Sequence, residues 1–126
     1  MTGIDIIKAS AGSGKTWTLT REFIRFLVPA DDAPFDERAF RHILAVTFTN
    51  KATEEMKSRI IKELHALATD PDYDYPEPGT RATTLMKKRA AMALTAILHD
   101  YASFSVSTID RFFQMVMRAF AREINQ

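Results

Sequence analysis

The chain has 126 residues, a length that fits one small domain. Its formal net charge of +1 favours neither a nucleic acid nor an acidic partner, so any DNA binding must come from local side chains. Because cysteine is absent, disulfides and thiolate metal sites are excluded, which fits a cytoplasmic protein. No apolar run approaches the roughly 20 residues of a membrane-spanning helix. We therefore expect no membrane partner.

The first half of the chain alternates between predicted strands and helices. An apolar run at residues 4–9 predicts a buried strand, and helical spacing begins at Lys15. A polar loop at 29–38 precedes a second strand at 42–48. Asn50 is a plausible N-cap for a helix over 51–68. The positions expected to face inward are Leu19, Phe23 and Leu27 in the first helix, and Ala52, Met56, Ile60, Leu64 and Leu67 in the second.

The second half continues the alternation. Prolines and acidic residues predict a surface loop at 69–80, followed by a helix over 81–101 with Met86, Ala90, Ala93 and Ile97 inward. Residues 104–107 predict a weaker third strand. The final amphipathic helix carries six apolar positions, which we expect in the core, with a partner surface as the alternative: Ile109, Phe112, Phe113, Val116, Phe120 and Ile124. Strands separated by helices, with no hairpin signal, indicate a parallel α/β architecture.

The most specific motif is the segment Ala-Ser-Ala-Gly-Ser-Gly-Lys-Thr at residues 9–16. It fits the phosphate-binding loop pattern GxxxxGK[ST], except that alanine replaces the first glycine. The pattern assigns an ATP-binding role to Ala11, Gly12, Ser13, Gly14, Lys15 and Thr16. Backbone amides and the start of the following helix would surround the β-phosphate. The catalytic candidates are Lys15, which would reach the β- and γ-phosphates, and Thr16, which would ligate Mg²⁺.

A solvated turn before a helix is the simpler explanation of such a segment. Here the motif lies between a predicted strand and a predicted helix, which is the context that a phosphate-binding loop requires. The loop alone does not identify the reaction, since ATPases, GTPases, kinases and motors share it.

Two further segments narrow the choice. Val-Thr-Phe-Thr-Asn-Lys-Ala-Thr-Glu-Glu-Met at 46–56 resembles motif Ia of superfamily-1 helicases of the UvrD/Rep and RecB/AddA type. Ser-Thr-Ile-Asp-Arg-Phe-Phe-Gln at 107–114 looks like their Thr-x-His-x-Phe motif, with Asp110 in place of histidine. The phosphate-binding loop has the form seen in RecB-like proteins. The three blocks follow the family's order, and they cover the whole chain.

The resemblance implies a RecA-like P-loop NTPase fold over 1–126, the first part of a motor domain, in which 69–102 could begin an inserted helical subdomain. It also implies single-stranded DNA contacts by Thr47, Phe48, Thr49, Asn50 and Thr108. These residues follow strands at the edge of a parallel sheet where ligands bind. An aromatic ring can stack on a base, while hydroxyls, an amide and Lys51 can bind phosphates. As alternatives, Phe48 could be a core residue, and Lys57, Arg59 and Lys62 could form a solvated helix face.

The leading interpretation is the N-terminal ATP-binding fragment of an ATP-dependent DNA helicase. The resemblance implies 3′-to-5′ translocation and a parent that could belong to a helicase-nuclease complex of double-strand break repair. No apolar strand ending in acidic residues supplies a Walker B motif, and Asp36-Glu37 follows a loop. We therefore expect a fragment without ATPase activity of its own. The alternative is a small self-contained P-loop kinase or nucleotide-binding protein that uses Asp110. A DNA-binding module independent of nucleotide would leave the P-loop unexplained.

Overall fold

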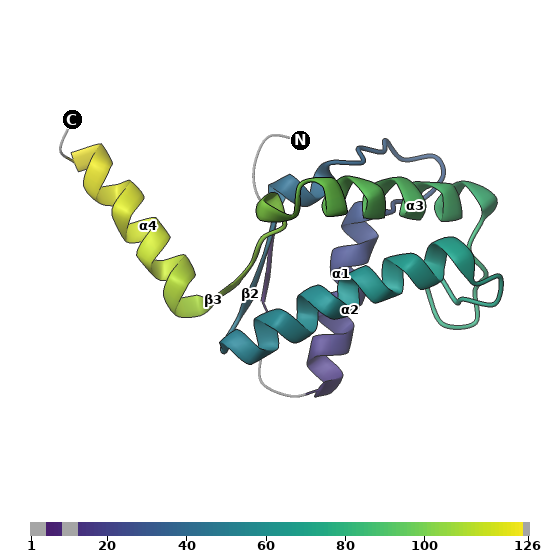
Figure 1. Cartoon of the computed structure of the whole chain (residues 1–126), viewed down its shortest axis with the longest axis horizontal. Helices are drawn as coiled ribbons and strands as arrows, with labels where there is room; N and C mark the ends of the chain where they lie inside the picture. The colour runs from purple at the N-terminus through teal and green to yellow at the C-terminus, as the bar shows by residue number, and fades with distance from the viewer. Residues whose placement is uncertain (1–4, 9–12, 125–126) are drawn as a thin grey trace.

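The structure, a computed structural model, describes residues 5–8 and 13–124. Its elements, in chain order, are β1 (Asp5–Lys8), α1 (Ser13–Leu27), the 3₁₀ helix η1 (Ala39–His42), β2 (Ile43–Thr47), α2 (Asn50–Thr69), α3 (Thr84–His99), the 3₁₀ helix η2 (Tyr101–Ser103), β3 (Val106–Thr108) and α4 (Ile109–Ile124). The described strands form one parallel sheet in the order β1-β2-β3 (Figure 1). The predicted parallel α/β architecture is confirmed.

The central strand β2 organises the sheet. All five of its residues are buried, because it has a hydrogen-bonded neighbour on either side. Side chains alternate along a strand. Accordingly, Ile43 and Ala45 join the core beneath the helices, while Leu44 and Val46 are buried outside that cluster. At the end of the sheet, Thr47 of β2 lies opposite Thr108 of β3.

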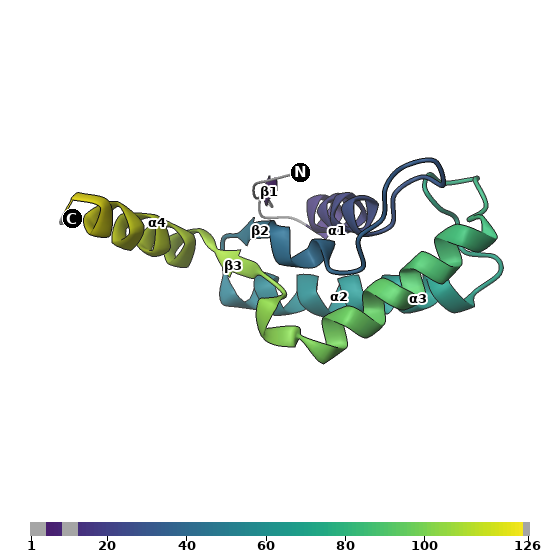
Figure 2. The ribbon, with the colours of Figure 1, turned by 90° about the horizontal axis from the view of Figure 1, so that it is seen from above.

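Helices α1, α2 and α3 share a single core on one side of the sheet (Figures 1 and 2). The inward stripe predicted for α3 is confirmed in full, and that of α2 is confirmed except at Ala52, which is only half-buried. In α1, Phe23 and Leu27 are buried and Leu19 packs against the cluster from its margin. Within the described residues, α3 packs on α2 in this same core. That the segment 69–102 begins an inserted helical subdomain stays a prediction.

The connection between α2 and α3 was expected to be a surface loop, and for Tyr75 this expectation is wrong. Its side chain is buried, and its hydroxyl donates a 2.6 Å hydrogen bond to the carbonyl of Val28, at the end of α1. Arg21 and Arg25 of α1 donate to the carbonyl of Pro76 at 2.7 and 3.2 Å. The Tyr75 hydroxyl thus satisfies the carbonyl of Val28, just beyond the last residue of α1, and two arginines of α1 satisfy a carbonyl of the loop. It thereby braces the C-terminal end of α1.

The final helix contradicts the expectation that its apolar residues are core. Helix α4 extends away from the rest of the molecule, on the side of the sheet opposite to α1–α3 (Figures 1 and 2). No residue of α4 is buried, and Phe113, Phe120 and Ile124 are about 60% exposed, at 62%, 59% and 65%. The apolar pattern specifies which face of the helix is suited to burial, but nothing among the described residues covers that face.

None of the helices in the described part of the chain is both long enough and apolar enough to cross a membrane.

The buried phenol of Tyr75 predicts a loss of stability at alkaline pH. Burial raises the pKa of Tyr75 to about 12, although Arg25 and Arg21 oppose the shift. The folded state therefore holds a proton that the unfolded chain releases near pH 10. Its contribution is complete below pH 10 and is lost as the pH rises to about 12, by on the order of 2 kcal/mol. Urea unfolding from pH 8 to 11.5 should show this decline, and Tyr75→Phe should make it shallower. Burial also raises the pKa of Tyr73, so this second tyrosine should account for the decline that remains. Tyr101→Phe, at an exposed tyrosine, is the control. Identical slopes for all three proteins would contradict the assignment.

Candidate functional site

Three helices begin at one edge of the sheet. Strands β1, β2 and β3 run parallel, so their carboxyl ends meet at the same edge, where the chain continues into α1, α2 and α4 (Figure 1). The first turn of a helix offers unpaired N–H groups and the positive end of the helix dipole. This edge is therefore suited to anions, and to phosphates in particular.

The phosphate-binding motif belongs to this edge by its place between β1 and α1. Only part of the motif is among the described residues. Ala11 and Gly12 fall outside them, and Ser13 to Thr16 are described by their backbone, within α1. That backbone forms the first turn of α1, which a short connection joins to the end of β1. A strand, a short connection and a helix that starts within the motif fit a nucleotide phosphate. Lys15 and Thr16 are the residues that would hold the phosphates and Mg²⁺.

At the end of β2, the Thr47 side chain is directed into the protein. Thr47 is 2% exposed, and its hydroxyl lies 2.6 Å from that of Thr53 on α2. It also lies within hydrogen-bonding distance of the carbonyls of Thr49 and Ser107, at 3.2 and 3.3 Å. The hydroxyl joins β2, β3 and α2, so its observed contacts are internal rather than available to DNA.

The next residues turn outward. Phe48 is 56% exposed, so it is not the core residue that the apolar strand allowed as an alternative. Thr49 is the N-cap of α2, where its hydroxyl accepts from the backbone N–H of Ala52 at 3.0 Å. The N-cap expected at Asn50 is therefore wrong by one residue, and Asn50 is the first residue of the helix. Asn50 and Lys51 are both exposed, beside a first turn whose N–H groups lack helical acceptors.

The neighbouring strand repeats this arrangement. The hydroxyl of Thr108 accepts from the backbone N–H of Arg111 at 3.3 Å, across the first turn of α4. A threonine that accepts in a cap still has its own O–H to donate. Thr49 and Thr108 can therefore cap their helices and donate to a phosphate at the same time. Both lie at the ends of adjacent, paired strands.

One aromatic residue of this region was missed by the sequence analysis. Trp17 follows the phosphate-binding motif in α1, and its ring lies 5.7 Å from the guanidinium of Arg21 and 5.5 Å from that of Arg59 on α2. Lys57 likewise lies 5.2 Å from the ring centre of Tyr101. Arg59 and Lys62 are exposed, as a solvated face predicts, whereas Lys57 is half-buried. Spacing along the sequence could not show which rings Lys57 and Arg59 meet.

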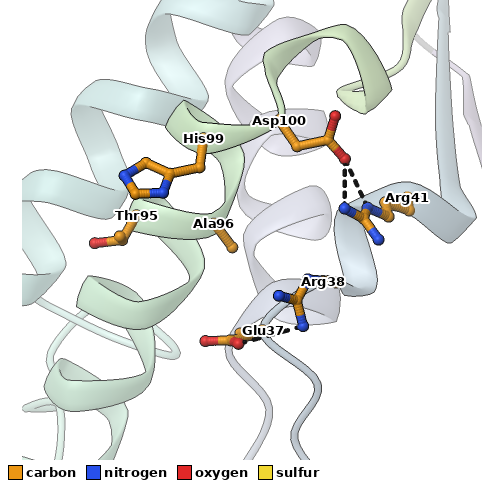
Figure 3. A pocket seen from close by; sticks show the side chains of 7 residues that line it. All are labelled: Glu37, Arg38, Arg41, Thr95, Ala96, His99 and Asp100. Carbon is orange, nitrogen blue, oxygen red and sulfur yellow. Dashed lines mark hydrogen bonds and ion pairs between the residues drawn. The ribbon is translucent and has the colours of Figure 1, made fainter.

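A hollow lies where the strands begin, away from this edge. It measures about 300 Å³ and is lined by Glu37, Arg38, Arg41, Thr95, Ala96, His99 and Asp100 (Figure 3). Arg41 is held by Asp100 at 2.6 Å, and Arg38 lies 3.5 Å from Glu37. A hydrogen bond from Ser103, together with Arg41, keeps the pKa of Asp100 below its ordinary value. The arginines are already paired with carboxylates, so the pocket offers little to an anion.

The model of the UvrD/REP helicase N-terminal domain matches residues 1–126. The chain belongs to this family. It is 32% identical over 109 residues to an ATP-dependent helicase/nuclease subunit of Natranaerobius thermophilus, in an alignment that covers 86% of the chain and 7% of that protein.

Other relatives match shorter stretches at higher identity. The RecBCD enzyme subunit RecB of Buchnera aphidicola is 46% identical over 68 residues, covering 50% of the chain and 6% of that protein. The ATP-dependent DNA helicase PcrA of Staphylococcus epidermidis is 47% identical over 55 residues, covering 44% of the chain and 7% of that protein. The chain is thus UvrD-like with an affinity to the RecB/AddA group. It spans well under a tenth of the length of these relatives.

The cap geometry predicts unequal effects of two neighbouring substitutions. Thr49→Ala removes the hydroxyl that accepts from Ala52, and an N-cap of this kind contributes about 0.5–2 kcal/mol. Asn50→Ala removes an exposed side chain at the first helical position and should cost less. Urea unfolding of both variants measures the difference, and Thr49→Ser should retain most of the stability. If Asn50→Ala lowers the free energy of unfolding more than Thr49→Ala does, Asn50 rather than Thr49 is the N-cap.

Proposed function

We propose that this chain is the N-terminal, ATP-binding part of an ATP-dependent DNA helicase, and that it contacts single-stranded DNA. The observation that carries the proposal is the common edge of the sheet. One helix that begins there carries the phosphate-binding motif. The exposed ring of Phe48 and the capping Thr49 directly precede the second helix, and the capping Thr108 directly precedes the third. Nucleotide and DNA would bind side by side, on neighbouring strands of one sheet.

The DNA contact centres on Phe48. Its ring is exposed, but its backbone is fixed between the buried strand β2 and the capped helix α2. A ring held in this way can stack on a base with little loss of entropy. The hydroxyls of Thr49 and Thr108, the amide of Asn50 and the ammonium of Lys51 would bind the adjoining phosphates. Thr47 would act indirectly, by holding the ends of β2, β3 and α2 together.

The nucleotide contact rests on the motif at 9–16. Lys15 would bridge the β- and γ-phosphates, and Thr16 would ligate Mg²⁺, while the first turn of α1 faces the anion. When bound, Mg·ATP would supply the hydrolysable bond, and this chain's residues would bind and orient it. The RecA-like P-loop fold, the cytoplasmic location and the 3′-to-5′ direction are part of the proposal.

The relatives extend the proposal to a larger protein. Their names describe ATP-dependent helicases and subunits of helicase-nuclease enzymes. A role in double-strand break repair within such a complex would follow for the whole protein. The kinase-like alternative is not favoured, since the family match covers the entire chain and Asp110 lies exposed in the first turn of α4.

Nucleotide binding should depend on Lys15. Charge-assisted phosphate contacts contribute roughly 1.5–3 kcal/mol, so Lys15→Ala should weaken Mg·ADP binding about tenfold or more. Titration calorimetry of the chain measures the affinity, with Lys88→Ala, at an exposed lysine of α3, as the control. Equal affinities for wild type and Lys15→Ala would remove the lysine from the site.

DNA binding should depend on Phe48. Because stacking contributes about 1–3 kcal/mol per base, Phe48→Ala should weaken binding of a labelled oligodeoxythymidylate by roughly five- to 150-fold. Stability should change little, since the ring is exposed. Phe26→Ala, at a 44% exposed phenylalanine near the far end of α1, is the matched control. If Phe48→Ala binds the oligonucleotide as tightly as wild type, the ring does not stack on a base and the proposed DNA contact is wrong.

A further inference from the structure

Trp17 links the two helices that begin at the proposed sites. It is the fifth residue of α1 and comes directly after Thr16, the last residue of the phosphate-binding motif. Its ring is half-buried and lies close to two guanidinium groups. Arg21 belongs to α1 itself, one turn further on. Arg59 belongs to α2, the helix whose first turn carries the proposed DNA contacts.

The two arginines differ in how they are held. Arg21 donates to the carbonyl of Pro76 at 2.7 Å, so it fixes Trp17 to the loop that braces α1. Arg59 forms no ion pair with any residue that the structure describes, although Glu55 and Glu63 lie one turn away on either side. Its guanidinium is instead placed 5.5 Å from the indole centre. The contact between Trp17 and Arg59 therefore crosses from the nucleotide helix to the DNA helix.

We propose that the contact between Trp17 and Arg59 couples nucleotide binding at the start of α1 to DNA binding at the start of α2. The inference rests on the proposed function. Phosphates bound at the first turn of α1 shift the helix turn that carries Trp17. The shifted indole then changes the position of the Arg59 guanidinium. Because α2 is one continuous helix from Asn50 to Thr69, Arg59 acts on the orientation of the first turn beside Phe48. Arg59 and Trp17 are positioning residues that touch neither ligand in this scheme.

The expected size of the coupling follows from the contact. A cation–π pair at a partly exposed site supports a factor of about two to five in affinity. Coupling between sites is reciprocal, so DNA should change nucleotide affinity by the same factor as nucleotide changes DNA affinity. This reciprocity gives two independent measurements of one quantity.

The test is a double titration of the 126-residue chain. Anisotropy of a labelled oligodeoxythymidylate gives the DNA affinity with and without saturating Mg·ADP, and the ratio is the coupling factor. We expect a ratio of about two to five for wild type, and a ratio near one for Arg59→Ala and for Trp17→Leu. Trp17→Phe, which retains an aromatic face, should keep part of the coupling. Lys62→Ala, at an exposed lysine on the same helix, should leave it unchanged.

A spectroscopic readout separates coupling from mere loss of DNA affinity. Trp17 is the sole tryptophan of the chain, so its emission reports this contact directly. Addition of oligonucleotide without nucleotide should change the emission of wild type and Lys62→Ala but not that of Arg59→Ala. If wild type binds both ligands and Arg59→Ala has the same coupling factor, the inference is overturned while the proposed function stands. If wild type binds neither ligand, the proposed function is overturned and the inference with it.

Discussion

The hydrogen bond between the hydroxyls of Thr47 and Thr53 is the contact on which the arrangement of the site depends. It joins the last residue of β2 to the first turn of α2, and Thr47 also reaches the carbonyl of Ser107 on β3. Both hydroxyls are buried, and each also has a backbone carbonyl within reach, since Thr53 lies 3.2 Å from the carbonyl of Thr49. With two strands and a helix held at this point, the chain between them must turn sharply. Phe48 lies in that turn, which is why a residue that continues an apolar strand is exposed.

The opposite end of α1 is fixed by a different set of contacts. Tyr75 closes the last turn of the helix, and Arg21 and Arg25 hold the same loop through the carbonyl of Pro76. Arg89 of α3 donates to the carbonyl of Ala30 just beyond the helix. The loop and α3 therefore hold the C-terminal end of α1 in place. Because α1 is held at its far end, a displacement of its first turn moves the side chains that contact neighbouring helices. The helix does not simply tilt as a rigid body.

The elements and most of their inward faces could be predicted because their patterns are local. Met86, Ala90, Ala93 and Ile97 recur at helical spacing, and all four are buried. The features that could not be predicted depend on contacts between distant segments. Tyr75 lies in a stretch rich in proline and acidic residues, and nothing near it in sequence indicates that its partner is the end of α1. The pairing of Trp17 with Arg59 is of the same kind, as it depends on how α1 packs on α2.

The nature of the site was more predictable than the role of each residue in it. Parallel strands bring their carboxyl ends to one edge, so the order of elements along the chain is enough to place Phe48 and Thr108 at that edge. Whether a given hydroxyl faces outward depends on the strand register and on which face of the sheet the last residue of the strand points to. The side chain of Thr47 points inward. Helix α4 also shows that a local pattern does not determine which contacts a side chain makes. Its apolar stripe defines a face suited to burial, and a face of this width is a contact surface in most soluble proteins. A periodic pattern identifies such a face from within one helix, but what covers a face depends on contacts with other segments, and among the described residues nothing covers this one.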